Sequence, residues 1–216
     1  HGMHNLPQPV RLFYMGDFFR YDRPQAGRYR QFHQFGIEVI GEVDASVDSE
    51  VIDLAWSVLE SVGVKDVTLL LNSIGDAMCR SGYIDELRSY YRSRASELVH
   101  DDCKRRLETN PLRLLDCKNG ACQPLIEAAP GSVDYLCDDC SKHWDALLGD
   151  LNAAGRSYKI DKRLVRGLDY YSRTVFEIVP PSDGQQSTLV AGGRYDGLIE
   201  LLGGRPTPGI GFALGI

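Results

Sequence analysis

Aromatic and aliphatic residues dominate two stretches near the start of the chain, VRLFYMGDFF (residues 10–19) and FHQFGIEVIG (residues 32–41). The polar segment RYDRPQAGRYRQ lies between them, and its proline and glycine are typical of a loop. Two strand-forming runs joined by such a loop predict a long antiparallel hairpin whose loop is basic.

Residues 46–62 carry the clearest helical pattern. The apolar residues that recur there at helical spacing are Val51, Leu54, Val58 and Val62. Ser46 or Asp48 is available to cap the start of this helix, and Gly63 follows its end. The next segment, VTLLLNS, is typical of a short buried strand, so the pattern predicts a helix packed on a sheet.

The chain becomes more polar between residues 78 and 158, where IDELRSYYRSRASELVHDDCKRRLE and SKHWDALLGDLNAAG predict helices. Strand-like sequences return in LVRGLDYYSRTVFEIV, STLVAGGRYDG and GIGFALGI. We therefore predict an α+β fold with an antiparallel sheet flanked by helices. Residues 1–77 and 159–216 form the two parts of this core, and residues 78–158 form an inserted, mainly helical subdomain.

The composition is that of an ordinary globular protein, with 43% hydrophobic and 25% charged residues. Apolar runs stay well short of the ~18 residues that a membrane helix needs, and the first residues do not resemble a signal peptide. We therefore expect a cytoplasmic protein with no membrane partner. The net charge of −6 argues against non-specific polyanion binding, so an RNA partner requires local basic patches such as Lys104-Arg105-Arg106.

The second strand of the hairpin combines a core face with a polar face. Alternate residues share a face, so His33, Phe35, Ile37 and Val39 are expected to face the core. Gln34, Gly36 and Glu38 then line the other face, with the amide and the carboxylate about 13 Å apart. The glycine leaves room for a ligand between them. Taken alone, this face is better explained as a solvent-exposed polar surface.

Four arginines lie close together around the hairpin loop: Arg20, Arg23, Arg28 and Arg30. The planar guanidinium group matches phosphate oxygens and stays charged at any working pH, so the cluster suggests a clamp for a polyphosphate. Contact with an RNA backbone or simple surface charge also fits. The P-loop motif does not occur in the sequence.

Two later segments carry further candidate residues. Arg166 is followed by Tyr170 and Tyr171, which point to opposite faces if this segment is a strand. The segment AGGRYDG (residues 191–197) reads as a strand end running into a helix. Its paired glycines allow the backbone to approach a ligand closely, or simply form a turn.

Four of the six cysteines are spaced as two pairs, Cys117-x4-Cys122 and Cys137-x2-Cys140. Four thiolates are the ligand number of a closed, tetrahedral structural zinc site. These spacings predict such a site, with unlinked thiols in a helical insertion as the alternative. Cys79 and Cys103 lie outside the pattern and are expected to be buried or free.

Together the segments resemble a known family. FFRYDRPQAGRYRQFHQFGIEVIG is similar to motif 2 of histidyl-tRNA synthetases, which are class II aminoacyl-tRNA synthetases, and RYRQFHQ is absent from other class II enzymes. LVRGLDYYSRTVFE and AGGRYDGL resemble the two histidine-specific segments of that family, and GIGFALGI resembles the opening of motif 3. The order and spacing of these segments agree over essentially the whole chain.

The resemblance implies that ATP, accompanied by Mg²⁺, binds at the hairpin. Arg20 would hold the α-phosphate and Arg28 the terminal phosphates, while Arg30 would support the loop. Asp22 stands where many class II enzymes carry glutamate, and this shorter acid would serve the adenine edge.

The resemblance also implies a histidine pocket. Gln34 would bind the backbone of the amino acid, and Glu38, Tyr171 and Tyr195 would enclose its imidazole. Arg166 would lie between the substrate carboxylate and the α-phosphate.

The implied function is ATP-dependent activation of L-histidine to histidyl-adenylate, followed by transfer to the acceptor arm of tRNA(His) by a homodimeric protein. The chain begins after motif 1, ends before the last arginine of motif 3 and carries no anticodon-binding domain. We therefore expect little or no aminoacylation from these residues alone. The alternative is the synthetase-like regulatory subunit of ATP phosphoribosyltransferase, against which stand RYRQFHQ, Arg166 and the inserted helices.

Overall fold

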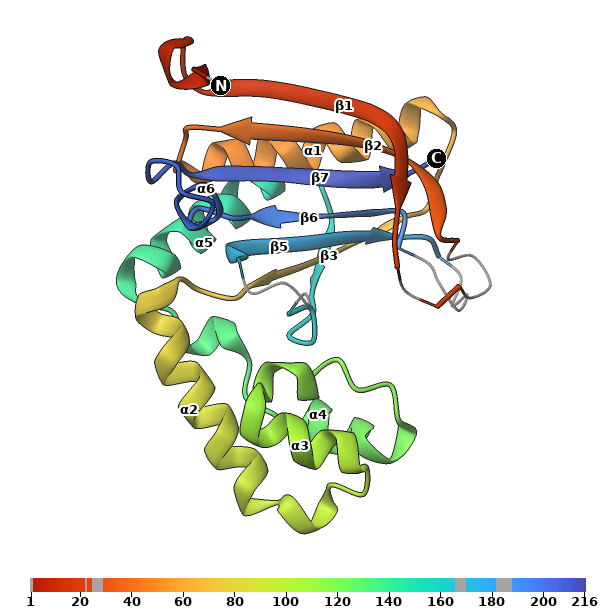
Figure 1. The fold of residues 1–216 in the computed structure, drawn as a ribbon, viewed down its shortest axis with the longest axis vertical. Coiled ribbons are helices and arrows are strands. Elements are labelled where there is room, and N and C mark those ends of the chain that lie inside the picture. Colours follow the sequence, from red (N-terminus) through yellow and green to blue (C-terminus); the bar gives the residue numbers. More distant parts are fainter. Residues whose placement is uncertain (1, 22, 25–28, 166–169, 182–187) are drawn as a thin grey trace.

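The hairpin predicted at the start of the chain is present and forms one edge of a seven-stranded sheet (Figure 1). The computed structural model describes residues 2–21, 23–24, 29–165, 170–181 and 188–216. Strand β1 (Val10–Phe19) pairs with β2 (Gln31–Ile40) in antiparallel register over ten residue pairs. The remaining strands are β3 (Thr68–Ser73), β4 (Tyr158–Ile160), β5 (Ser172–Val179), β6 (Val190–Arg194) and β7 (Gly209–Gly215).

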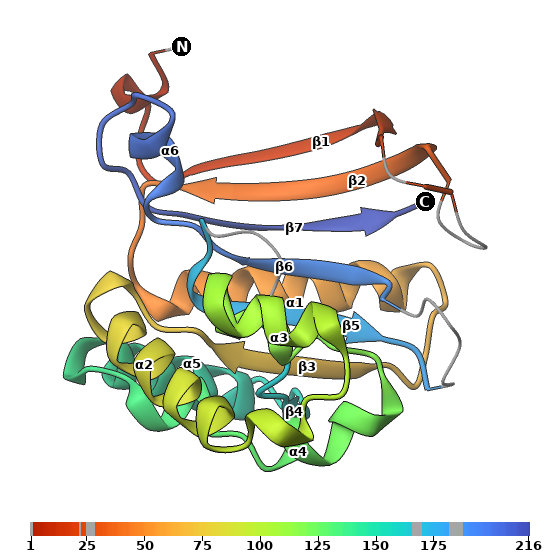
Figure 2. The ribbon, with the colours of Figure 1, turned by 60° about the horizontal axis from the view of Figure 1, so that its bottom comes forward.

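The strand order is β1-β2-β7-β6-β5-β3-β4, and Figure 2 shows the strands stacked in this sequence. All neighbouring pairs are antiparallel except β3 and β4, which run parallel. The predicted sheet is thus mixed at its last strand. The three-residue β4 was not anticipated, because so short a strand leaves no periodic pattern to detect.

Helices α1 (Ala45–Ser61) and α5 (Asp138–Ala153) pack on one face of the sheet. Helix α1 begins at Asp44, whose side chain accepts a hydrogen bond of 2.9 Å from the Ser46 backbone N–H. The predicted caps Ser46 and Asp48 are instead helical residues. The turn that ends α1 includes Gly63 at φ +83°, a left-handed conformation that favours glycine.

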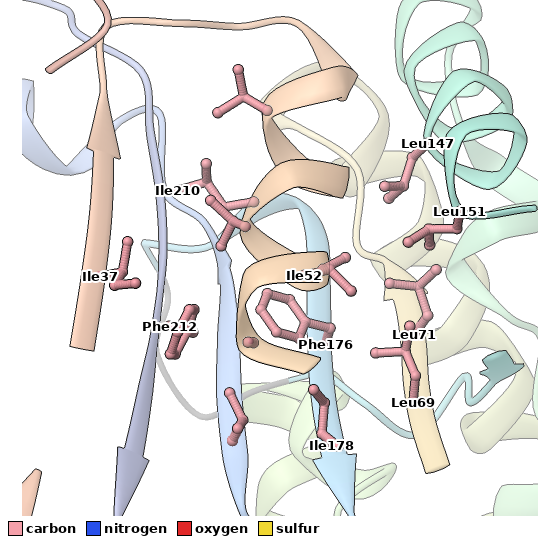
Figure 3. Packing of buried hydrophobic residues seen from close by; sticks show 14 of the residues in the cluster. Ile37, Ile52, Leu69, Leu71, Leu147, Leu151, Phe176, Ile178, Ile210 and Phe212 are labelled. Carbon is pink, nitrogen blue, oxygen red and sulfur yellow. The ribbon is translucent and has the colours of Figure 1, made fainter. Parts of the chain in front are cut away.

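The main hydrophobic core lies between α1, α5 and the sheet (Figure 3). It is formed by side chains from five strands and both helices, including Ile37, Ile52, Leu71, Leu147, Leu151, Phe176, Ile210 and Phe212. The predicted core face of β2 is correct for Ile37 and Val39, which are buried, and Phe35 packs against the same cluster. The expectation for His33 is wrong: it lies near the exposed end of the strand and pairs with Asp17 at 2.7 Å.

A second hydrophobic core lies within the polar middle of the chain. It joins α2 (Ala77–Ser93), α3 (Asp101–Thr109) and α4 (Gln123–Glu127), which lie together beyond the β3 edge of the sheet in Figure 1. The short helices of the described chain are η1 (Met3–Asn5), η2 (Ala95–Glu97), η3 (Pro111–Leu114), η4 (Gly120–Cys122), η5 (Ser132–Tyr135) and α6 (Leu198–Leu201). Helix α5 packs with the main core instead, so the predicted unit 78–158 is divided between two cores.

A buried ion pair links the end of β6 to the first turns of α1. Arg194 and Asp48 are both fully buried, and the Arg194 Nε donates to the two carboxylate oxygens at 3.0 and 3.2 Å. The Arg194 Nη1 also donates to the backbone carbonyl of Glu42 at 2.9 Å and to Asp196 at 3.0 Å. The guanidinium therefore ties together three segments of the chain.

In the part of the chain that the structure describes, no helix has the length and apolar character needed to cross a membrane.

Asp48→Asn should lower the free energy of unfolding by about 3–5 kcal/mol, because it removes the fully buried partner of Arg194 and leaves only the partly exposed Asp196 to balance its charge. The control is Glu50→Gln on the same helix, which removes a 2.8 Å pair between Glu50 and the half-exposed Arg11. An exposed pair is worth about 1 kcal/mol or less. Urea unfolding of both variants measures the difference, and equal effects would contradict the assigned role of Asp48.

Candidate active site

The face of the sheet opposite the main core carries the polar residues that the strand alternation predicted. Gln34, Gly36 and Glu38 share this face of β2, because Ile37 and Val39 point into the core on the other side. In the sheet register Glu38 stands opposite Gly211 of β7 and Gly36 stands opposite Tyr14 of β1. The hairpin and β7 therefore place a carboxylate and a tyrosine side by side over neighbouring strands.

Glycines on β2, β6 and β7 leave the backbone bare beneath these side chains. A Cβ on Gly211 would overlap the Glu38 carboxylate, and a Cβ on Gly193 would lie 2.9 Å from the Tyr171 ring. Because such distances are too short for real contacts, only glycine allows the two side chains to lie down on the sheet. The paired glycines of AGGRYDG thus serve close approach rather than a turn.

The central interaction of the site joins Glu38 to Tyr195, whose hydroxyl donates a hydrogen bond to the Glu38 carboxylate. Burial raises the pKa of Glu38, and the hydrogen bond from Tyr195 acts in the opposite direction. Burial also raises the pKa of Tyr195, so the phenol stays protonated and serves as the donor. Glu38 is therefore a partly desolvated acceptor with room for a second donor.

Two further tyrosines approach the same carboxylate. The Tyr14 ring lies over Gly36 and the Tyr171 ring over Gly193. Burial raises the pKa of Tyr14, and the charge of Glu38 adds to this effect. The site thus combines one acceptor with several aromatic rings. This combination suits a flat, polar ring that carries an N–H group.

Tyr195 is held from both sides along the chain. Its backbone N–H donates to the Gly209 carbonyl at 2.7 Å, and its ring lies over Gly209. The residue before it is the buried Arg194, and the residue after it is Asp196. The Asp196 carboxylate accepts hydrogen bonds from Arg194 at 3.0 Å and from the Gly209 N–H at 3.3 Å. Strand alternation therefore sends Arg194 into the core and Tyr195 into the site.

Tyr171 is positioned by a contact with the inserted helices. The Arg80 guanidinium of α2 donates to the Tyr171 carbonyl oxygen. Tyr170 and Tyr171 precede β5, and their ring centroids are only 4.9 Å apart. The predicted separation onto opposite faces is therefore wrong, because this segment is not an extended strand.

At the far end of the hairpin the Arg20 guanidinium lies 3.8 Å from the centroid of the Phe32 ring. The Arg20 N–H donates to the Arg30 carbonyl at 2.8 Å and continues the ladder beyond the strand ends. Since Phe32 shares the face of Gln34, Arg20 lies over the same surface as Glu38. Three predicted site residues, Asp22, Arg28 and Arg166, lie outside the described part of the chain.

A cleft of about 750 Å³ lies between the inserted helices and the open face of the sheet. Its walls include Leu70 of β3 and Glu177 of β5 on one side and the segment around residues 110–118 on the other. The basic residues among its lining are Arg80, Arg106, Arg113, Lys118 and Arg163. Arg80 belongs both to this cleft and to the support of Tyr171, so the two sites adjoin.

The structure does not assemble the predicted four-cysteine site. Cys117 and Cys122 lie beside Cys103 in the second core, with Sγ–Sγ distances from Cys103 of 3.3 and 3.9 Å. Cys137 and Cys140 instead form a group with Asp76 and Cys79. Each predicted pair lies instead beside two residues that the cysteine spacing did not include. His100 and Cys103 lie beside Cys117, and Asp76 and Cys79 lie beside Cys137 and Cys140.

Sequence reasoning missed three supporting residues: Tyr14, Arg80 and Arg194. Tyr14 had a usable signal, since pairing the two hairpin strands across the arginine-rich loop puts it opposite Gly36. Arg80 and Arg194 had none, because each acts on a segment far away in the sequence.

Known proteins resemble the chain over its full length. A sequence model of histidyl-tRNA synthetases matches residues 1–216. The histidine–tRNA ligase of Dehalococcoides mccartyi is 57% identical over 216 residues, which are 100% of this chain and 51% of that protein. The histidine–tRNA ligase of Desulforamulus reducens is 51% identical over 214 residues, 99% of this chain and 51% of that protein. The chain thus spans about half the length of these curated relatives.

Solved structures show the same architecture. The crystal structure of the apo histidyl-tRNA synthetase of S. aureus matches with a TM-score of 0.76 and 40% identity, covering 100% of this chain and 51% of that chain. A protein described as an ATP phosphoribosyltransferase regulatory subunit/histidyl-tRNA synthetase from Bacillus halodurans C matches with a TM-score of 0.64 and 24% identity, covering 99% and 58%. The second likeness shows the fold alone, whereas the first confirms the predicted class II synthetase fold.

Replacing Glu38 by glutamine should change how stability depends on pH. Burial raises the folded-state pKa of Glu38 above its ordinary value of about 4.3. Between the unfolded and folded values the native state binds more protons, so this group's contribution to the free energy of unfolding falls as pH rises. The free energy of unfolding of Glu38→Gln minus that of the wild type should therefore grow from about pH 4 upward. It should level off above the folded-state pKa of Glu38.

Urea unfolding at a series of pH values measures this difference. Glu50→Gln is the control with the opposite sign, because hydrogen bonding to Arg11 lowers the pKa of Glu50. If the difference in the free energy of unfolding between Glu38→Gln and the wild type stays flat or falls with pH, burial does not destabilise the charged form of Glu38.

Proposed function

Because the chain belongs to the histidyl-tRNA synthetase family, we propose that it supplies the part of the catalytic domain that binds histidine and ATP. In this proposal the protein activates L-histidine to histidyl-adenylate and transfers it to tRNA(His). The observation that carries the proposal is the Glu38–Tyr195 pair on its bed of glycines. It is a recognition site for an N–H donor on a flat ring, which is what imidazole offers.

Glu38 accepts a hydrogen bond from one ring nitrogen of the substrate. Tyr195 already donates to the same carboxylate and so fixes its orientation before the substrate arrives. The Tyr171 ring forms a wall of the pocket above Gly193. A side chain without an N–H group would leave the desolvated Glu38 unpaired, which is how such a pocket rejects competitors.

ATP lies along the hairpin in this proposal. Arg20 neutralises the α-phosphate, Arg28 binds the terminal phosphates with Mg²⁺, and Asp22 receives the adenine edge. Arg20 lies on the same face of the sheet as Gln34 and Glu38, which supports this role. Gln34 binds the backbone of the amino acid between the two ends of the site.

The first reaction needs no nucleophile from the protein. A carboxylate oxygen of histidine attacks the α-phosphorus in line, the new O–P bond forms histidyl-adenylate, and the bond to pyrophosphate breaks. Arg20 and Arg166 stabilise the charge that develops on the phosphate oxygens. Rate enhancement comes from positioning and from this preorganised charge.

The cleft beside the inserted helices is the proposed place for the acceptor arm of tRNA(His). Its lining contains five basic and three acidic residues, so the cleft carries a local excess of positive charge on a chain of net charge −6. Its adjacency to Tyr171 through Arg80 would bring the 3′ end of the RNA close to the adenylate. The homodimer, the cytoplasmic location and the low activity of these residues alone stay predictions from the sequence.

The regulatory-subunit alternative is weaker. Relatives at 49–57% identity are described as histidine–tRNA ligases, and the regulatory protein shares 24%. Histidine-dependent exchange of pyrophosphate into ATP, measured on the longest natural polypeptide that carries these residues, separates the two functions.

In that assay Glu38→Ala should lower kcat/KM for histidine by about 10- to 150-fold, because it removes a charged hydrogen-bond acceptor. Tyr171→Phe should act in the same direction, and the apparent affinity for ATP should change far less in both. Glu50→Gln, an exposed carboxylate on α1, is the control and should match the wild type. Equal losses for histidine and ATP would contradict the pocket assignment.

Arg166→His should mainly slow adenylate formation. A group that stabilises developing charge contributes about 3–4 kcal/mol to the barrier, so the single-turnover rate should fall by at least about 100-fold. Histidine binding, followed by calorimetry, should weaken much less. A near-normal rate of adenylate formation would remove Arg166 from the mechanism.

A further inference from the structure

All six cysteines are free thiols, and the fold gathers five of them into two groups, one with His100 and one with Asp76. The sixth, Cys122, lies beside the first group, with its Sγ 3.9 Å from Cys103 Sγ. We propose that each group binds one structural zinc ion. The first site is formed by His100, Cys103, Cys117 and Cys122. The second is formed by Asp76, Cys79, Cys137 and Cys140. Neither site uses a residue of the proposed substrate pocket.

The distances in the first group match those around a tetrahedral ion. Thiolates bound about 2.3 Å from zinc lie about 3.8 Å from one another, and a nitrogen ligand lies slightly closer. Cys103 Sγ is 3.3 Å from Cys117 Sγ, 3.9 Å from Cys122 Sγ and 3.7 Å from His100 Nδ1. Cys103 Sγ thus lies within about 4 Å of the other three donors, and the donor atoms of His100, Cys103 and Cys117 all lie within 4.8 Å of one another.

Local structure holds these donors in place. His100 precedes the first turn of α3, and its carbonyl accepts from the Cys103 N–H at 2.9 Å. The Asn119 carbonyl accepts from the Cys122 N–H at 3.0 Å, and the Gln123 amide donates to the Cys117 carbonyl at 2.6 Å. Each pair of ligands therefore sits on one tight turn, as in a metal knuckle.

The surrounding core explains why a metal would be needed. The second core contains short elements, of which α3 has nine residues and α4 has five. Helices of this length are not stable by themselves. The three sulfurs lie inside this core, so a bound ion would cross-link α3 to the chain around residues 117–122.

The second group rests on separate geometry. Asp76 is the N-cap residue of α2 and Cys137 is the N-cap residue of α5, and each is followed three positions later by a cysteine. One donor atom from each of the four residues lies within 4.8 Å of the others, and Cys79 Sγ is 3.5 Å from Asp76 Oδ1. The site joins the start of the insertion to a helix of the main core.

The donor chemistry selects zinc. The three thiolates in each set are soft ligands, which favour zinc or an iron–sulfur centre over magnesium or calcium, and zinc also accepts an imidazole or a carboxylate as its fourth ligand. Four protein ligands leave no open position, so the ions would be structural. A disulfide between Cys103 and Cys117 is the competing outcome for the first site.

The test is the metal content of the purified, reduced protein. Wild type should contain about two zinc ions per chain, and each double variant, Cys103→Ser/Cys117→Ser and Cys137→Ser/Cys140→Ser, should lose one and keep the other. Asp102→Asn is the control beside Cys103, because its carboxylate is bonded to Arg105 rather than to a cysteine. It should leave the metal content unchanged.

A cobalt titration of the wild type covers the case in which a variant fails to fold. Two equivalents of Co²⁺ should produce thiolate charge-transfer bands and tetrahedral d–d bands. Zinc lost only from one double variant supports that site and overturns the other. The proposal is overturned if the protein contains iron in place of zinc, or if both variants retain all their metal. It is also overturned if the chain is metal-free, with either a Cys103–Cys117 disulfide or six alkylatable thiols. Metal content is independent of catalysis, so these outcomes leave the proposed function untouched.

Discussion

The buried pair of Arg194 and Asp48 is the interaction on which the arrangement of the site depends. Placing two charges in the core is costly, and the cost is offset because the guanidinium also binds the Glu42 carbonyl and Asp196. The pair fixes the end of β6 against the first turns of α1. Tyr195 is the next residue, so the alternation of the strand converts this anchored position into the position of a side chain on the opposite face. The donor that orients Glu38 is thereby attached to a backbone position that several hydrogen bonds hold in place.

Three glycines of the sheet make room for the side chains of the proposed histidine pocket. Gly193 and Gly211 lie directly opposite each other in the β6–β7 ladder, and Gly36 lies on the next strand. Each is covered by a tyrosine ring or by Glu38 rather than by a side chain of its own. The other face of the sheet carries Phe176 of β5 and Ile210 and Phe212 of β7, which belong to the main core together with residues of α1. One layer of backbone therefore separates the core, which holds the Arg194–Asp48 pair among apolar side chains, from the face that carries Glu38 and Tyr195.

The parts of the fold that follow local periodicity were predictable, and those that depend on distant partners were not. The hairpin, α1 and the polar face of β2 follow from alternation and helical spacing over ten residues or more. The cap at Asp44 was missed because several acids precede α1 and only one has the required backbone geometry. The cysteine pairs were identified but combined incorrectly, since spacing along the chain shows which ligands share a turn and not which turns meet in space. Asp48 was predicted as a possible helix cap, and its pairing with Arg194, far away in the sequence, had no signal in the local pattern.

The hydrogen bond from Arg80 to the Tyr171 carbonyl joins two parts of the protein that have separate hydrophobic cores. Arg80 also donates to the Gly75 carbonyl at 3.3 Å, at the point where the chain leaves the sheet for α2. A shift of α2 relative to the sheet would therefore alter the wall of the pocket. Thermodynamic linkage makes such a coupling reciprocal: a ligand that favours one position of the inserted helices changes the affinity of the pocket, and occupancy of the pocket changes the affinity for that ligand by the same factor. Under the proposed function, Arg80 would thus couple the adjoining sites for histidine and for the acceptor arm.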